Sequence, residues 1–246
     1  MKLKQIAKNL LVHTPYYPVH IGNYIRSLYF QKYLGQLPVE KVTNVLDAGC
    51  GGGRYALKMA KKYPWIVIIA MDIKVQIFQS NCPSNFFFRQ GNLLELKDKD
   101  TYDFVYCIDV LEHIPNNTQV IERFYQVLKN GGYLYLHLPY DIGKKRIFPD
   151  KFFAEFNTWA EEEHIGGQYT LDEMKSTLHK IGFEIIAAEN TFGFMGELAW
   201  ELDRVTDKRI ALKIFLMPLL KLLGHVSVNI KHTSGNISVL ARKLGD

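Results

Sequence analysis

Short apolar runs alternate with segments of helical periodicity from residue 42 onward. The runs at 42–46, 65–73, 85–92, 101–110, 133–139 and 183–190 are rich in β-branched and aromatic residues, which predicts strands. Residues 53–63 carry helix formers with apolar positions on one face. Residues 74–82 and 171–181 also predict helices, and 116–130 predicts a helix stopped by Gly131 and Gly132. Residues 20–35 predict one more helix before the first strand.

Strict alternation of strand and helix predicts an α/β fold with a parallel sheet covered by helices on both faces. Crossovers of this kind are right-handed, so the sheet is expected to be doubly wound. Ligands of such sheets bind beyond the carboxyl ends of the strands, near the point where strand order reverses.

The turn after the first predicted strand reads "VLDAGCGGGRYA" at 45–56. The spacing of its glycines alone does not decide which kind of ligand the turn would bind. Gly51-x-Gly53-x-x-Ala56 fits a dinucleotide fingerprint, and Asp72 ends the second strand where an acid would hold ribose hydroxyls. Asp47 argues against a pyrophosphate, because its carboxylate would repel one and would favour an ammonium or sulfonium charge. The alternative is that Asp47 only caps the turn through backbone N–H groups.

Four blocks together resemble the class I S-adenosylmethionine-dependent methyltransferases of the broad small-molecule and quinone type. "VLDAGCGGGRYA" is similar to their first motif, and "IAMDI" to the second-strand acid that grips the ribose. "YDFVYCIDVLEHIP" resembles the fourth-strand block, and "LKNGGYLYLHLP" the glycine turn into strand five. The resemblance spans about residues 42–139.

The resemblance implies a Rossmann-like, seven-stranded sheet that is mostly parallel and has an antiparallel last strand, with helices on both faces. One methyltransferase domain is then expected over residues 1–246. Its parts would be an N-terminal helical cap at 1–41, a core at 42–190 and 236–244, and a helical insertion at 191–235 on the active-site side.

The resemblance also implies the cofactor S-adenosyl-L-methionine, with S-adenosyl-L-homocysteine as product. Asn92 stands where the family usually has aspartate; its carbonyl oxygen can accept from adenine and its amide can donate. A degenerate site that binds no cofactor stays open as an alternative. The predicted cofactor-binding residues are Asp47, Gly49, Cys50, Gly51, Gly53, Asp72, Ile73, Asn92, Leu93, Ile108 and Asp109.

If the group that receives the methyl is a hydroxyl, a base is expected to remove its proton. His164, in a loop expected above the site, is the first candidate and His113 the second, while His137 on a strand is better explained as a structural hydrogen-bonding residue. An aromatic stripe on the first helix would line the acceptor pocket or, as an alternative, belong to the core. The predicted pocket residues are Tyr24, Tyr29 and Tyr140.

Charge and composition add a prediction about partners. The chain has 246 residues, net charge +5 and three cysteines without metal-ligand spacing, which predicts a reducing cytoplasmic setting and no metal site. The basic, apolar segments 1–12 and 204–231 predict contact with a membrane surface, against the alternatives of a lid, a dimer contact or ordinary packing. The run around Pro218 is expected to be too short, too charged and too interrupted to span a bilayer.

The predicted function is methyl transfer to a small or lipid-linked acceptor, at a hydroxyl oxygen or else at nitrogen or carbon. Two alternatives remain: a catalytically silent binding or assembly subunit, and an RNA methyltransferase. "CIDVLEHIP" lacks the N/D-P-P-Y/F pattern of enzymes that act on bases, and no RNA-binding module is present, which disfavours nucleic acid. The sequence does not predict the oligomeric state.

Overall fold

The computed structural model describes residues 19–76, 82–140, 142 and 146–245. The chain divides into two compact units. The first comprises residues 1–32, 141–161 and 190–236, and the second residues 33–140, 162–189 and 237–246. The expected partition into one domain with a cap, a core and an insertion stays a prediction.

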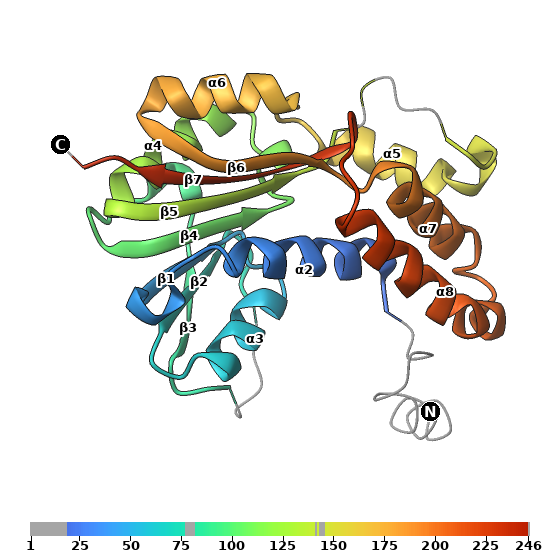
Figure 1. Cartoon of the computed structure of the whole chain (residues 1–246), viewed down its shortest axis with the longest axis horizontal. Helices are drawn as coiled ribbons and strands as arrows, with labels where there is room; N and C mark the ends of the chain where they lie inside the picture. The colour runs from blue at the N-terminus through green and yellow to red at the C-terminus, as the bar shows by residue number, and fades with distance from the viewer. Residues whose placement is uncertain (1–18, 77–81, 141, 143–145, 246) are drawn as a thin grey trace. The chain divides into compact units, whose positions relative to one another are not determined.

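The second unit is built on a seven-stranded sheet of order β3-β2-β1-β4-β5-β7-β6 (Figure 1). Strands β1 to β5 pair in parallel, and β7 is antiparallel to β5. The predicted fold class is confirmed, including the antiparallel last strand. The strands are β1 (Asn44–Ala48), β2 (Val67–Asp72), β3 (Phe86–Gln90), β4 (Tyr102–Ile108), β5 (Leu128–Leu138), β6 (Phe183–Thr191) and β7 (Asn236–Lys243).

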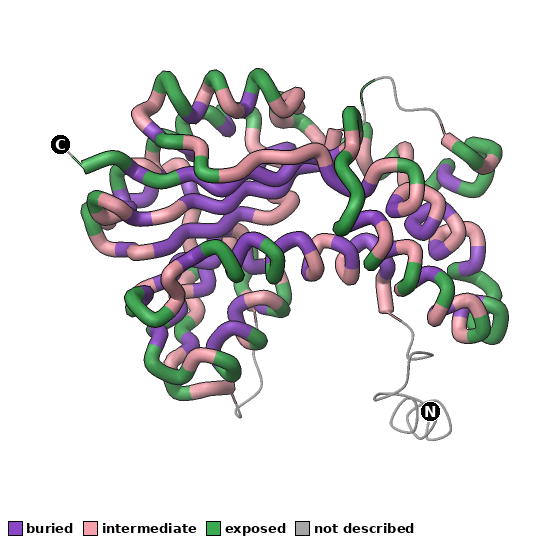
Figure 2. The backbone as a smooth tube through the Cα atoms, in the orientation of Figure 1, coloured by how far each residue is buried: buried purple, intermediate pink, exposed green. Residues whose placement is uncertain are grey.

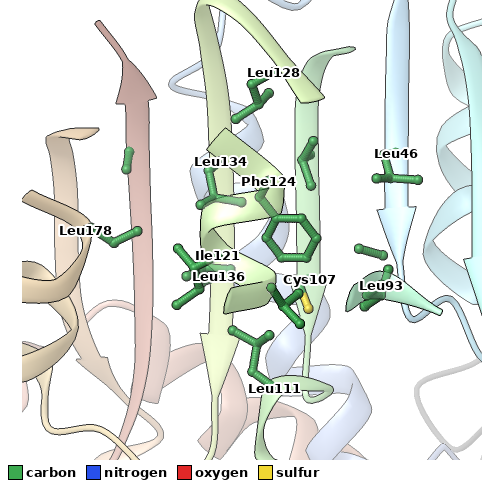
Figure 3. Close-up of a cluster of buried hydrophobic side chains, with 14 of the residues drawn as sticks. Leu46, Leu93, Cys107, Leu111, Ile121, Phe124, Leu128, Leu134, Leu136 and Leu178 are labelled. Carbon is green, nitrogen blue, oxygen red and sulfur yellow. The ribbon is translucent and has the colours of Figure 1, made fainter. Parts of the chain in front are cut away.

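The sheet is largely buried along its central strands (Figure 2), because helices cover both of its faces. Helices α4 (Asn117–Val127) and α6 (Leu171–Ile181) pack on one face, and α3 (Arg54–Lys62) packs against β2. Ile121 and Phe124 of α4 are fully buried with Leu134 and Leu136 of β5 (Figure 3). This core fixes the strand ends that carry the candidate site.

Helix α4 ends earlier than the glycine pair predicts. It stops at Val127, and β5 already begins at Leu128, which pairs with Tyr102 of β4. The backbone from Leu128 onward pairs with β4 and leaves the helix before Gly131, so the predicted helix end is wrong. Residues 77–81 of the helix predicted at 74–82 lie outside the described residues.

The described residues of the first unit are mainly helical. They are α2 (Ile21–Leu34), α5 (Ala154–Glu163), α7 (Gly193–Val205) and α8 (Ile210–Val228). Their shared core contains Ile25, Tyr29, Trp200, Met217 and Leu220.

Helix α8 corrects the expectation that Pro218 interrupts this segment. The helix runs through Pro218 for 19 residues. Among the described residues it is the one helix long and apolar enough, by length and composition alone, to cross a membrane. The mean hydropathy over an 18-residue stretch of this helix is 1.6, and 28% of that stretch is buried inside the protein. The predicted segment 1–12 lies outside the described residues.

Candidate functional site

The turn after β1 is anchored to the end of β2. The backbone N–H groups of Gly49 and Cys50 both donate to the carbonyl oxygen of Met71, at 2.8 and 2.9 Å. Gly49 has φ +81, and a Cβ there would lie 2.3 Å from Cγ2 of Val110. Only glycine fits, because both the backbone conformation and the neighbouring side chain exclude a Cβ.

Asp72 ties the glycine turn to the carboxyl end of β2. Its Oδ2 accepts from the N–H of Gly51 at 2.8 Å, and its Oδ1 accepts from the N–H of Lys74 at 2.9 Å. A carboxylate has about four lone-pair directions, so it can accept further hydrogen bonds from ribose hydroxyls. A Cβ on Gly51 would meet no atom within 4 Å, and Ile73 is 64% exposed. The turn therefore leaves open space beside its backbone. Gly53, with φ +68, is the N-cap residue that precedes α3.

Asp47 is the buried acid of this turn. Burial raises its pKa from 3.8 to about 7; hydrogen bonding from the Tyr106 hydroxyl and the Ala56 backbone lowers it, and the charge of Asp72 raises it further. Among the described residues, its Oδ2 has no hydrogen-bond partner. A buried carboxyl oxygen without a partner is costly, and a cationic ligand group would relieve that cost.

Asn92 begins the short helix η2 (Leu93–Glu95) after β3. Its side-chain oxygen accepts from the N–H of Leu94 at 3.0 Å, as an N-cap does. The amide NH₂ group is thus turned away from that bond and can donate elsewhere. Leu93 is buried. The adenine contacts of both residues stay predictions.

The end of β4 is joined to β5 through His137. Asp109, which follows Ile108, has φ +52, and its N–H donates to the carbonyl oxygen of His137 at 3.0 Å. Its Oδ1 lies 2.6 Å from Nδ1 of the buried His137. These bonds hold the carboxylate of Asp109 at the carboxyl edge of the sheet.

The two predicted base candidates come together although 50 residues separate them in the chain. His113 closes the short helix η3 (Leu111–His113), and its ring centroid lies 5.1 Å from that of His164. Nδ1 of His113 is 2.9 Å from the carbonyl oxygen of Glu163 and must donate to it. In the neutral ring Nε2 then carries the lone pair that can accept a proton.

Glu112 joins the two histidines, and sequence reasoning did not single it out. Its Oε1 is 3.9 Å from Nε2 of His113, and the ligand atoms of Glu112, His113 and His164 all lie within 4.8 Å of one another. A carboxylate and two imidazoles at this spacing could hold a metal ion. The predicted absence of a metal stays a prediction. Only the adjacency of Glu112 to His113 in "LEHIP" could have suggested the residue.

Gly166 locks the loop that carries His164 onto η3. Its N–H donates to the carbonyl oxygen of Glu112 at 2.8 Å, and a Cβ there would lie 2.5 Å from the carbonyl oxygen of Leu111. The Asn117 amide adds donors to the carbonyl oxygens of Leu111 and Gly167, at 3.2 and 2.9 Å. The meeting of the two histidines is therefore fixed by backbone contacts.

The predicted pocket tyrosines lie in different units. Tyr24 and Tyr29 belong to α2 in the first unit, where Tyr29 is fully buried and donates to the carbonyl oxygen of Ser227 at 3.1 Å. The hydroxyl of Tyr24 is 2.7 Å from Nε2 of His225. Tyr140 follows β5 in the second unit and is partly exposed. Their roles toward an acceptor stay predictions.

A family model described as "Methyltransferase domain" matches residues 22–188. Two curated relatives are ubiquinone biosynthesis O-methyltransferases. That of Acinetobacter baylyi is 28% identical over 130 residues, covering 50% of this chain and 53% of the relative. That of Coxiella burnetii is 28% identical over 126 residues, covering 48% and 51%. The chain spans about half the length of these relatives.

Solved structures share the fold. A putative sarcosine dimethylglycine methyltransferase from Galdieria sulphuraria aligns with a TM-score of 0.57 at 18% identity, covering 82% of this chain and 78% of that chain. Phosphoethanolamine N-methyltransferase 2 of Haemonchus contortus, in complex with S-adenosyl-L-methionine, aligns with a TM-score of 0.56 at 18% identity, covering 82% and 49%. At these identities the likeness is one of fold.

Proposed function

This chain belongs to the methyltransferase-domain family, and we propose that it transfers a methyl group from S-adenosyl-L-methionine to a hydroxyl oxygen of a small or lipid-linked acceptor. The prediction of a class I methyltransferase that uses this cofactor is confirmed by the family match and the shared fold. The names of the curated relatives support a small-molecule acceptor, which belongs to the proposal. The hydroxyl and the lipid-linked character belong to the proposal. The relatives' name, O-methyltransferase, supports an oxygen acceptor.

The observation that carries the proposal is the buried Oδ2 of Asp47, which has no hydrogen-bond partner among the described residues. It lies at a glycine turn with open space at Gly51, which suits a nucleoside that brings positive charge instead of phosphate. Asp47 would face the cationic end of the cofactor, and Asp72 would hold the ribose hydroxyls. When bound, the cofactor supplies an already activated methyl group.

The protein's remaining task is to orient the acceptor and to take its proton. Orientation alone can supply much of the rate enhancement of such a displacement. Nε2 of His113 carries the lone pair that can accept the hydroxyl proton, and His164 lies beside it. Glu112, close to the same ring, stabilises the imidazolium that forms.

Calorimetric titration with S-adenosylhomocysteine tests the cofactor site. We expect binding by the wild type and a loss of at least about tenfold in affinity for Asp72→Ala, because two hydrogen bonds of the turn and the ribose contacts disappear. Asp172→Ala is the matched control, since its carboxylate is 92% exposed on α6. Absence of binding by the wild type would contradict the proposal.

Methyl transfer from labelled donor to lipid and small-molecule extracts tests the acceptor class. We expect label in an alkali-stable ether product that is lost in His113→Gln and His164→Gln. Cofactor binding without transfer to any fraction would instead support the silent binding subunit.

A further inference from the structure

Helix α8 is apolar on two opposite faces, and the first unit covers only one of them. Met217 and Leu220 are fully buried in the core of that unit, and Gly224 packs against Ile25 of α2. The buried side of the helix accounts for its place in the fold. It does not account for the apolar residues on the other side.

The exposed side carries a continuous apolar stripe. Phe215, Leu219 and Leu222 follow the i, i+4, i+7 spacing of one helix face and are 73%, 47% and 59% exposed. Leu212, 39% exposed, and the exposed Ala211 extend the row by one turn. We name these five residues the α8 stripe; Figure 2 shows the exposed stretches along the helix. The stripe is about 16 Å long, and contiguous exposed apolar surface is a common feature of interaction sites.

Basic residues flank helix α8 on both sides. Arg209 precedes α8 and Lys231 follows it, and both are exposed. The helix itself contains no acidic residue. Lys208 pairs with Glu155 at 3.1 Å, but both side chains are almost fully exposed, so this pair is weak and screened by salt. Apolar surface between cationic ends complements an anionic lipid surface, whose headgroups are negative and whose acyl region is apolar.

The ion pairs of Lys213 favour a helix that would lie in the plane of a bilayer over one that would cross it. Nζ of Lys213 is 2.8 Å from Oδ1 of Asp203 and 2.6 Å from Oδ1 of Asp207. If α8 crossed a bilayer, Lys213 would lose its ion pairs with these carboxylates, and Met217 and Leu220 would become exposed to lipid. An in-plane helix keeps all of these contacts and buries only the stripe.

We propose that the α8 stripe docks this protein onto an anionic membrane surface, with Phe215 at the centre of the contact and Arg209 and Lys231 among the headgroups. The proposal is independent of methyl transfer, because it concerns a surface of the first unit. A protein held at the membrane would meet lipid-linked molecules at raised local concentration.

Cosedimentation of the full chain with vesicles is the first test. Vesicles of phosphatidylglycerol and phosphatidylcholine are compared with vesicles of phosphatidylcholine alone. We expect binding to the anionic vesicles that falls with added salt and is at least about tenfold weaker in Phe215→Glu, because a charge replaces the central anchor. Trp65→Glu is the matched control, since Trp65 is an aromatic residue of the second unit with 53% exposure.

Three results would overturn the proposal. They are absence of binding by the wild type, equal binding by Phe215→Glu, and equal loss in Trp65→Glu. A dimer in light scattering that becomes a monomer in Phe215→Glu, without vesicle binding, would assign the stripe to a second copy of the chain. Leu222→Glu, checked by circular dichroism, repeats the test should Phe215→Glu fail to fold.

Discussion

Replacing Asp47 by asparagine is expected to stabilise the cofactor-free protein at pH 8 while weakening its hold on the cofactor. The pKa of this buried carboxyl is raised from 3.8 to about 7. One pKa unit corresponds to about 1.4 kcal/mol, so charging Asp47 in the folded state costs about 4 kcal/mol relative to the unfolded chain. Asparagine keeps the shape of the side chain and carries no charge to bury.

The direction with pH follows from proton linkage. Because the folded pKa is the higher one, the contribution of Asp47 to stability is complete below pH 4, falls as the pH rises, and is lost above about pH 7. The wild type should therefore lose stability between pH 4 and 7 relative to Asp47→Asn. Since the amide still needs hydrogen bonds, we expect a net gain of about 1–2 kcal/mol for the variant at pH 8, or roughly 3–6 °C in melting temperature.

Cofactor binding should show the opposite preference. A cationic ligand favours the carboxylate, so wild-type affinity for S-adenosylmethionine should rise up to tenfold per pH unit below about pH 7 and level off above it. Asp47→Asn should bind more weakly and with little dependence on pH. Thermal melts and calorimetric titrations between pH 5 and 9 measure both effects. A less stable variant at pH 8, or a wild-type affinity that does not change with pH, would refute the reasoning.

Three further substitutions test the geometry of the site. Gly49→Ala should destabilise the protein by about 2–4 kcal/mol in urea unfolding, because Gly49 has φ +81 and its new Cβ would lie 2.3 Å from a valine side chain. Gly52→Ala, with open space around the new Cβ, should destabilise it far less. Gly166→Ala should lower methyl transfer more than Gly167→Ala does, because only the first Cβ would press on backbone carbonyl oxygens, at 2.5 Å against a nearest atom at 3.7 Å; equal rates for the two variants would contradict this. His164→Gln should slow transfer by roughly 100-fold and leave the affinity for S-adenosylhomocysteine unchanged in titration; a loss of affinity would place His164 at the cofactor.

The strand-helix alternation and the glycine turn could be predicted because both are local patterns. Buried parallel strands need apolar runs, and the turn at Gly49 needs glycine for steric reasons that hold within a few residues. The end of α4 could not be predicted, because pairing of Leu128 with β4 overrides the local signal of the glycine pair. Tertiary hydrogen bonds outweigh propensity at such boundaries.

The histidine cluster shows a second limit of sequence reasoning. His113 and His164 could each be proposed as a base, but their contact depends on Gly166 docking onto η3. Glu112 comes close to His164 only through that docking. The continuity of α8 through Pro218 is a third case. Proline cannot donate a backbone hydrogen bond, and the burial of Met217 and Leu220 on either side of it favours the continuous helix in a way that the local sequence does not show.

The position of β7 in the sheet determines when the sheet can be completed during synthesis of the chain. β7 lies between β5 and β6, yet it is the last strand to leave the ribosome, after residues 139–235 have been made. Until then β5 has an open edge, and β6 has no strand to hold it to the sheet. A nascent chain must keep that edge from pairing with another chain for several seconds at ordinary rates of synthesis. A stop codon just before residue 236 would therefore remove more than one strand, because β6 would lose its attachment as well.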